Sequence, residues 1–219
     1  MTTPKLIIGN YNYSSWSLRA WLALRKSGVD FITERIPLDS AEFEQRISAL
    51  SPSRRVPALW HAGLCVWDSL AIGEYVNEVF ADGGLWPADR SARALGRSMA
   101  AEMHSGFEHL RGRMPMNIRA TGRTVPLTEP LRLDIERIWA IWAQARALRP
   151  AEGPWLLGRY SLADAMFAPV VLRLRTYGVT SPPELAAYCR QVLEDPDLRP
   201  WQDAALAEDE VIAADEAGG

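Results

Sequence analysis

The sequence has little cysteine, almost no lysine and no long hydrophobic run. Its 219 residues include two cysteines, Cys65 and Cys189, which lie far apart and belong to no recognisable metal or redox motif. We therefore expect reduced thiols. Since no signal peptide is visible either, we expect a cytoplasmic protein. The longest apolar run, residues 165–172, is far shorter than a membrane span, so no membrane association is expected.

Positive charge is also scarce. The 27 acidic residues outnumber the 24 basic ones and give a net charge of −3. Proteins that bind nucleic acid carry a basic surplus, so a nucleic-acid partner is not expected. Two of the basic residues are lysines, Lys5 and Lys26, and the remaining 22 are arginines. Arginine favours planar recognition of carboxylates, although genome composition is the simpler explanation of this usage.

Strand and helix patterns alternate over the first eighty residues. Short apolar or alternating runs predict strands, and periodic apolar faces predict helices. The predicted strands are residues 5–9, 30–38, 57–60 and 64–67, and the predicted helices are residues 17–26, 39–50 and 69–80. Ser69 is the expected N-cap of the last helix. The order is therefore βαβαββα, which defines a small α/β layer.

The strand signal disappears from Asp89 onward. Turn residues near Gly83 divide the chain into an α/β domain, residues 1–83, and an all-α bundle, residues 84–219. The predicted helices of the bundle are residues 91–113, 128–148, 161–175, 182–193 and 198–206. The tail after Leu206 holds five acidic residues and no basic one, so we expect it to fray.

A proline begins the third predicted strand, in the run Arg55-Val56-Pro57. Proline cannot donate to a sheet ladder, so this position lies at a sheet edge. If the Val56–Pro57 bond is cis, the N–H and C=O of Val56 are free to pair with an extended peptide ligand. The alternative is an ordinary trans proline at a strand start, because only about 5% of such bonds are cis.

Asp68 and Ser69 lie where the fourth strand meets the following helix. A helix N-terminus binds carboxylates through its free N–H groups and its dipole. The Ser69 hydroxyl could add a hydrogen bond, and Asp68 could hold an ammonium group. Together they suit the head group of a free amino acid, although Ser69 could equally be a simple helix cap.

Three serines, Ser14, Ser15 and Ser17, follow the first strand. A serine hydroxyl at a helix start can donate a hydrogen bond to a thiolate, and the helix dipole helps to lower the pKa of that thiol. Lowering the pKa by two units corresponds to about 2.7 kcal/mol. The same serines could be capping residues. The loop holds no Cys-x-x-Cys, so disulfide exchange is not expected.

These motifs together resemble the cytosolic glutathione S-transferases. The similarity is carried by Val56-Pro57-Ala58-Leu59, by the run from Asp68 to Tyr75, and by residues 158–164, which resemble the family's capping box. It covers the chain from about residue 5 to residue 206. The resemblance implies a thioredoxin-like N-terminal domain followed by an all-helical domain, the GST fold, and a homodimer.

The resemblance also implies a glutathione site. Val56 would pair through its backbone with the cysteinyl part of glutathione, beside a cis Pro57. Asp68 and Ser69 would hold the γ-glutamyl end, and Arg55 would face the glycyl carboxylate. These residues match the family's motif in this chain, with Asp68 in place of the commoner Glu or Gln.

The thiol would lie near the start of the first helix. The run from Ser14 to Arg19 is similar to the zeta-type pattern Ser-Ser-Cys-x-Trp-Arg, with Trp16 in place of cysteine. The resemblance implies that the hydroxyl of Ser15 or of Ser14 stabilises the thiolate and that Trp16 borders the bound glutathione. Both serines stay candidates.

A second substrate would bind between the two domains. On the predicted helix 91–113, Met103 and Phe107 could form an apolar wall, with His104 and Arg111 as polar members. A methionine and an aromatic at helical spacing are also typical of a core, and His104 as a general base competes with an ordinary helix histidine.

The sequence thus predicts a glutathione transferase that activates the thiol of glutathione and conjugates it to a small electrophile, a detoxification reaction that needs no metal. One alternative is a glutathione-dependent cis–trans isomerase of a dicarboxylic acid, similar to maleylacetoacetate isomerase. The serine pair favours it and Trp16 opposes it. Arg173 and Arg175 could bind an anionic substrate or simply neutralise acids. Another alternative is a non-catalytic module of the same fold that binds other proteins.

Overall fold

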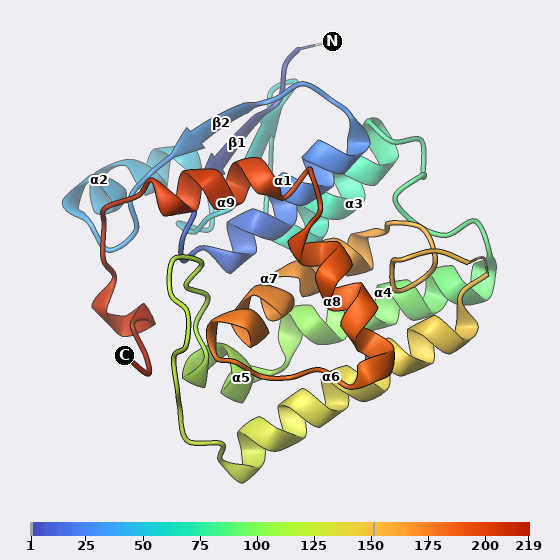
Figure 1. The fold of residues 1–219 in the computed structure, drawn as a ribbon. Helices are drawn as coiled ribbons and strands as arrows, with labels where there is room; N and C mark the ends of the chain where they lie inside the picture. The colour runs from blue at the N-terminus through green and yellow to red at the C-terminus, as the bar shows by residue number, and fades with distance from the viewer. Residues whose placement is uncertain (1, 151) are drawn as a thin grey trace.

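The computed structural model describes residues 2–150 and 152–219 and has a four-stranded sheet above a group of helices (Figure 1). The strands are β1 (Lys5–Ile8), β2 (Ile32–Arg35), β3 (Ala58–His61) and β4 (Leu64–Val66), in the order β2-β1-β3-β4. β1 pairs in parallel with β2 and antiparallel with β3, and β3 pairs antiparallel with β4. The predicted βαβαββα order is confirmed.

Three helices accompany the sheet: α1 (Ser15–Ser27), α2 (Ala41–Leu50) and α3 (Ser69–Val79). The expected Ser69 cap is wrong, because Asp68 is the N-cap of α3. Its Oδ1 accepts hydrogen bonds from the N–H of Leu70 at 2.9 Å and of Ala71 at 3.4 Å. A carboxylate at this position reaches the free amides and also suits the positive end of the helix dipole.

The second half of the chain is helical, as predicted. Its helices are α4 (Arg90–Ser105), α5 (Glu108–Arg113), α6 (Glu129–Leu148), α7 (Leu162–Thr176), α8 (Pro183–Leu193) and α9 (Arg199–Leu206). The single helix expected over residues 91–113 is wrong. Gly106 is extended and Phe107 is left-handed, with φ of 58°, so the helix breaks there and α5 begins in a new direction.

One hydrophobic core joins the two halves of the chain. α7 is buried almost all round and packs on α1 and α4, while α1 also packs on α3. The N-terminus of α7 is fixed by Asp164, whose carboxylate accepts from the N–H of Ser161 at 2.8 Å and of Leu156 at 3.1 Å. Burial raises the pKa of Asp164 to about 6. The helix after Ser161 is therefore well placed to carry site residues, and a domain boundary at residues 83/84 stays a prediction.

The C-terminal tail does not fray, which corrects the sequence-based expectation. It leaves α9, runs beside the segment that follows α5 (Figure 1), and includes a short 3-10 helix, η1 (Ala213–Asp215). The N–H of Thr124 donates to the carbonyl of Gly218 at 3.1 Å. The acidic side chains hold the tail because they accept hydrogen bonds from the rest of the protein.

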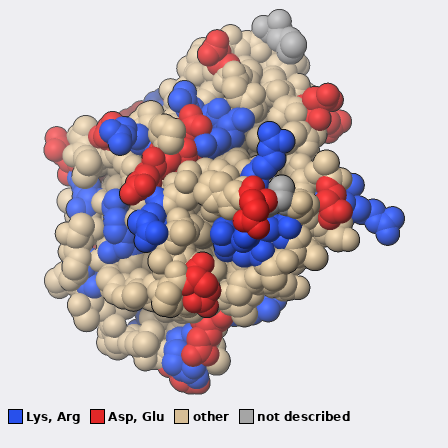
Figure 2. Space-filling model, turned by 45° about the vertical axis from the view of Figure 1, so that its right-hand side comes forward, with Lys and Arg blue, Asp and Glu red and all other residues tan. Residues whose placement is uncertain are grey.

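Charges of both signs alternate over the face seen in Figure 2. The sequence holds nearly equal numbers of acidic and basic residues, and here they are interspersed. No helix in residues 2–150 and 152–219 is long and apolar enough to cross a bilayer.

Candidate functional site

Two cavities meet beside the start of α1. Cavity 1 has a volume of about 390 Å³ and cavity 2 about 460 Å³, and both are lined by Trp16, Arg55, Val56 and Arg111. Cavity 1 is further lined by Tyr13, Ser14, Ser15, Leu38, Phe43, Arg54, Pro115, Met116, Arg173 and Asp215. Cavity 2 is further lined by Ser53, Pro57, Trp67, Asp68 and His104. The cavities therefore draw on the segment just before β3, on the start of α1, and on the helical half.

Val56 lines both cavities. The Val56–Pro57 peptide is cis, as is the Trp67–Asp68 peptide. Among the described residues, none forms a hydrogen bond with the backbone N–H or C=O of Val56. Two groups that a peptide ligand can pair with are thus free just before β3. β3 lies between β1 and β4, so the expected position of Pro57 at a sheet edge is wrong.

Asp68 and Ser69 differ in how they are placed. Asp68 Oδ1 caps α3, and its Oδ2 lies 3.0 Å from Nε2 of His104 on α4. Ser69 is 2% exposed, and its Oγ has no hydrogen-bond partner in the part of the chain that the structure describes. It lines neither cavity but lies directly behind Asp68, at the first turn of α3. A buried hydroxyl with an unused bond is costly unless a ligand or water satisfies it.

The two candidate serines have different hydrogen bonds. The hydroxyl of Ser14 donates to Oγ of Ser17 at 2.7 Å, and Ser17 also accepts from the N–H of Gly9 at 3.2 Å. Oγ of Ser15 instead accepts a hydrogen bond from Nη2 of Arg173 at 3.1 Å. The proton of Ser14 is therefore in use, whereas that of Ser15 remains available to a ligand. A cationic donor to Ser15 also strengthens its own O–H as a donor.

Trp16 separates two arginines. The guanidinium carbon of Arg19 lies 4.5 Å from the Trp16 ring centroid and that of Arg111 lies 5.5 Å from it. The ring of His104 meets Trp16 edge-on at 5.0 Å. Cations are attracted to the face of an indole ring, so Trp16 holds both guanidinium groups close to the cavities.

Arg19 and Arg173 form a buried cationic group with Arg111. Arg19 is 1% exposed and Arg173 is 4% exposed. Within the described residues, none of the guanidinium nitrogens of Arg19 has a hydrogen-bond partner, and neither do Nε and Nη1 of Arg173. Burial and the neighbouring arginines lower the pKa of both Arg19 and Arg173. Buried positive charge without a carboxylate partner favours the binding of an anion.

Met103 and Phe107 do not form the expected apolar wall. Met103 is fully buried and Phe107 is nearly so, both within the main hydrophobic core. The break at Gly106 turns the chain, and the helical half instead contributes Pro115 and Met116, just after α5, to the apolar lining of cavity 1. His104 lines cavity 2 and Arg111 lines both cavities, and their role toward a second substrate stays a prediction.

Among the lining residues that sequence reasoning missed, two are charged. Asp215 lines cavity 1 although it belongs to the tail, and Arg54 lines it beside Arg55. Arg173 had been considered for an anionic substrate, but nothing in the sequence joined it to Ser15, 158 residues earlier. In the described ranges, no group of three or more His, Cys, Asp or Glu could hold a metal ion.

A mixed sheet with a cis proline, followed by a helical bundle that closes a cleft over α1, defines a glutathione-transferase type of fold. The model of the glutathione S-transferase N-terminal domain matches residues 13–79. The chain also superposes on the crystal structure of a glutathione transferase homologue from Burkholderia, solved with bound glutathione. The TM-score is 0.71 at 25% identity, covering 93% of this chain and 98% of that one.

Two isomerases are similar in sequence. Maleylacetoacetate isomerase of Rattus norvegicus is 26% identical over 84% of each chain. A probable maleylacetoacetate isomerase of Caenorhabditis elegans is 32% identical over 50% of this chain, which spans about half (51%) of that relative. Residues 13–79 thus match the glutathione S-transferase N-terminal domain, and the chain is similar over most of its length to glutathione transferases and to maleylacetoacetate isomerases.

Proposed function

We propose that this protein binds glutathione across cavities 1 and 2, lowers the pKa of its thiol through Ser15, and transfers the thiolate to a small electrophile. The observation that carries the proposal is the hydrogen bond from Arg173 to Ser15. It leaves the Ser15 proton free at a cavity bordered by the unpaired backbone of Val56.

Glutathione would be held at three points. Its cysteinyl backbone would pair with Val56, which places the sulfur toward the start of α1. Its γ-glutamyl end would meet Asp68 through the ammonium group and Ser69 through the carboxylate. Its glycyl carboxylate would face Arg55, which is exposed and lines both cavities.

The chemistry is a nucleophilic attack by the bound thiolate. The thiol proton leaves to solvent, and the Ser15 O–H donates to the sulfur, so the charged form is favoured. In a substitution, a sulfur–carbon bond forms and the leaving group departs with its electron pair. Arg111 and Arg173 would stabilise the negative charge that develops on the acceptor.

The two serines allow a direct test. Ser15→Ala removes the free donor, so the thiol pKa of bound glutathione should rise by about one to two units, which corresponds to roughly 1.4–2.7 kcal/mol. Ser14→Ala is the matched control. It should change the pKa little, because the hydroxyl of Ser14 already donates its hydrogen bond to Oγ of Ser17. Titration by thiolate absorbance measures both. An unchanged pKa in Ser15→Ala would contradict the role of Ser15.

A second candidate function is a glutathione-dependent cis–trans isomerase acting on a dicarboxylic acid. The buried arginine group of Arg19, Arg111 and Arg173 favours it, since carboxylates are the natural partners of guanidinium. The thiolate would add to a double bond, the resulting single bond would rotate, and the sulfur–carbon bond would break again. Turnover of a cis-dienone diacid without net loss of glutathione, and no conjugation of a chlorinated aromatic, would select this candidate.

The remaining properties follow from the family. We propose a homodimer, a role in detoxification and a cytoplasmic location. The chain would divide into a glutathione-binding domain, residues 1–83, and a helical domain, residues 84–219. A non-catalytic module stays an alternative: it would bind immobilised glutathione yet turn over no member of a broad electrophile panel. Light scattering measures the oligomeric state.

A further inference from the structure

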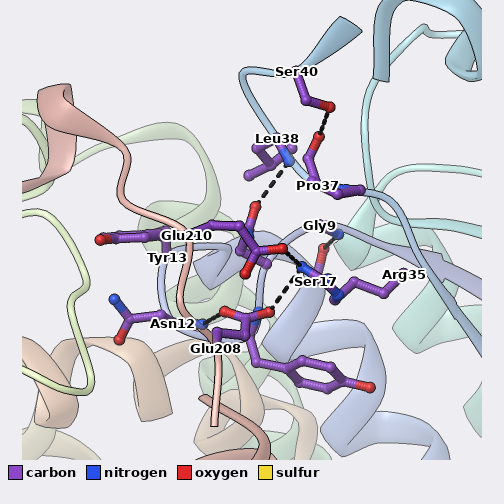
Figure 3. Close-up of polar contacts among 12 residues, drawn as sticks. Gly9, Asn12, Tyr13, Ser17, Arg35, Pro37, Leu38, Ser40, Glu208 and Glu210 are labelled. Atoms are coloured by element: carbon purple, nitrogen blue, oxygen red, sulfur yellow. Dashed lines mark hydrogen bonds and ion pairs between the residues drawn. The ribbon is translucent and has the colours of Figure 1, made fainter. Parts of the chain in front are cut away.

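The C-terminal strap, residues 208–216, is fixed at its first residue to the loop before α1. The carboxylate of Glu208 accepts from the N–H of Tyr11 at 2.8 Å and from that of Asn12 at 2.9 Å. Figure 3 shows this carboxylate turned toward Asn12, with Arg35 close to both Glu208 and Glu210. Glu208 is 8% exposed, so this anchor is a buried contact.

The strap is fixed again at its last residue. Glu216 accepts from the hydroxyl of Tyr13 at 2.6 Å and from the side-chain amide of Asn117 at 2.7 Å, and it pairs with Arg123. Between the anchors, the guanidinium group of Arg119 donates to two backbone carbonyls of the strap, those of Glu208 and Glu210. Both ends are therefore held independently of the residues between them.

Asp215 is carried into the site by this arrangement. It is half-buried and is the one acidic residue among those that line cavity 1, against Arg54, Arg55, Arg111 and Arg173. Within the described residues, no arginine nitrogen lies within 4.0 Å of its carboxylate. Asp215 and the arginines thus face the same space without forming an ion pair, and a ligand can enter between them.

We infer that Asp215 is a specificity-determining residue whose carboxylate opposes the carboxylates of the second substrate at Arg173 and Arg111. The inference rests on the proposed function, because it concerns the acceptor side of the same site. Two carboxylates in one half-buried cavity repel each other more strongly than in water. Asp215 therefore weakens the binding of highly charged acids and leaves neutral acceptors unaffected.

Asp215 is not needed to hold the strap. Glu208 and Glu216 accept the anchoring hydrogen bonds. Among the described residues, none donates a hydrogen bond to the carboxylate of Asp215. Asp215→Asn should therefore fold and keep its strap in place. Asp209→Asn is the matched control, since Asp209 lies in the same strap, is exposed, and lines neither cavity 1 nor cavity 2.

The test uses succinate as an unreactive dianion and succinamide as its neutral analogue, with affinities measured by calorimetry on the whole protein. Asp215→Asn should bind succinate on the order of tenfold more tightly than the unchanged protein, a loss of repulsion that corresponds to about 1.4 kcal/mol. Its affinity for succinamide should not change. Asp209→Asn should match the unchanged protein, and Asp215→Glu, which keeps the charge, should restore weak succinate binding.

Two outcomes would overturn the inference: equal succinate affinity in Asp215→Asn and the unchanged protein, or weaker binding in the variant. Failure of the proposed function is seen separately. Glutathione binding and the pKa of its thiol are measured on the same proteins without succinate. If the unchanged protein did not bind glutathione, or did not lower the pKa of its thiol, the proposed function would be refuted, whatever the succinate result.

Discussion

Cavities 1 and 2 share four lining residues yet differ in how their charges are satisfied. In cavity 2 the carboxylate of Asp68 is satisfied, because it lies 3.0 Å from Nε2 of His104 and caps α3. In cavity 1, within the described part of the chain, two guanidinium nitrogens of Arg173 have no partner, and Asp215 forms no ion pair with it. The two cavities therefore suit different groups. Cavity 2 suits the zwitterionic end of a ligand, and cavity 1 suits the thiolate and an anionic acceptor.

The largest expected effect comes from Arg173. Arg173→Met removes both the donor to Ser15 and the cation at the acceptor side. We expect kcat/KM for an anionic acceptor to fall by about a hundredfold, which is the 2–3 kcal/mol typical of a hydrogen bond to a charged group. Steady-state kinetics measure it.

Arg175→Met is the control for this prediction. Arg175 lies on the same helix and donates to the carbonyl of Ile118 at 2.7 Å, but it lines neither cavity. Its kcat/KM should stay near that of the unchanged protein. An equal fall in kcat/KM in the two variants would show that both substitutions disturb α7. Arg173 would then have no specific role at the site.

The next effect concerns cavity 2. Asp68→Asn keeps a good helix cap but loses the negative charge, so glutathione should bind about tenfold more weakly. Succinate binding in cavity 1 should not change. Asp89→Asn is a matched control, because Asp89 caps α4 in the same way, accepting from Ala92 at 2.8 Å. If Asp68→Asn weakened both ligands equally, the two cavities would not differ as described.

Arg19 should affect stability more than binding. Its buried guanidinium has no hydrogen-bond partner among the described residues and lies near two other arginines. Replacing even a buried ion pair or triad by apolar side chains often stabilises a protein by about 1–4 kcal/mol. Arg19 has no such partner in the described part of the chain, so Arg19→Met should raise the free energy of unfolding. Urea denaturation measures it, with the exposed Arg137→Met as control. A clear loss of stability would mean that the contact with Trp16 outweighs the burial cost.

The smallest expected effect distinguishes a residue that lines cavity 1 from a residue of the hydrophobic core. Met116→Leu should change KM for an apolar acceptor by a few-fold, because Met116 lines cavity 1. Met103→Leu should change it little, since such swaps in a core cost less than about 1.5 kcal/mol and Met103 lines neither cavity. A larger change of KM in Met103→Leu than in Met116→Leu would indicate that Met103 contacts the acceptor.

Local patterns predicted the fold well. The short apolar strands, the turn near Gly83 and the apolar stripe of α6 each follow from periodicity within one segment. The break between α4 and α5 was not predictable in this way. The apolar spacing of Met103 and Phe107 continues across Gly106, and the left-handed Phe107 depends on tertiary contacts.

The sequence indicated candidate site residues only where they lie within one short motif. Val56, Asp68 and the serines lie in such motifs, whereas the grouping of Arg173 with Ser15 requires the packing of α7 on α1. The acidic tail has the composition of a frayed end. It is ordered because Glu208 meets two free backbone amides, of Tyr11 and Asn12, a match that composition does not reveal.

Under the proposed function, the hydrogen bond between Arg173 and Ser15 makes activation of the thiol depend on both halves of the chain. The first half alone would hold the tripeptide, but its serine would lack the cation that polarises it. Correct docking of the helical half would thus be required for reactivity. A partly folded molecule would bind glutathione without activating it.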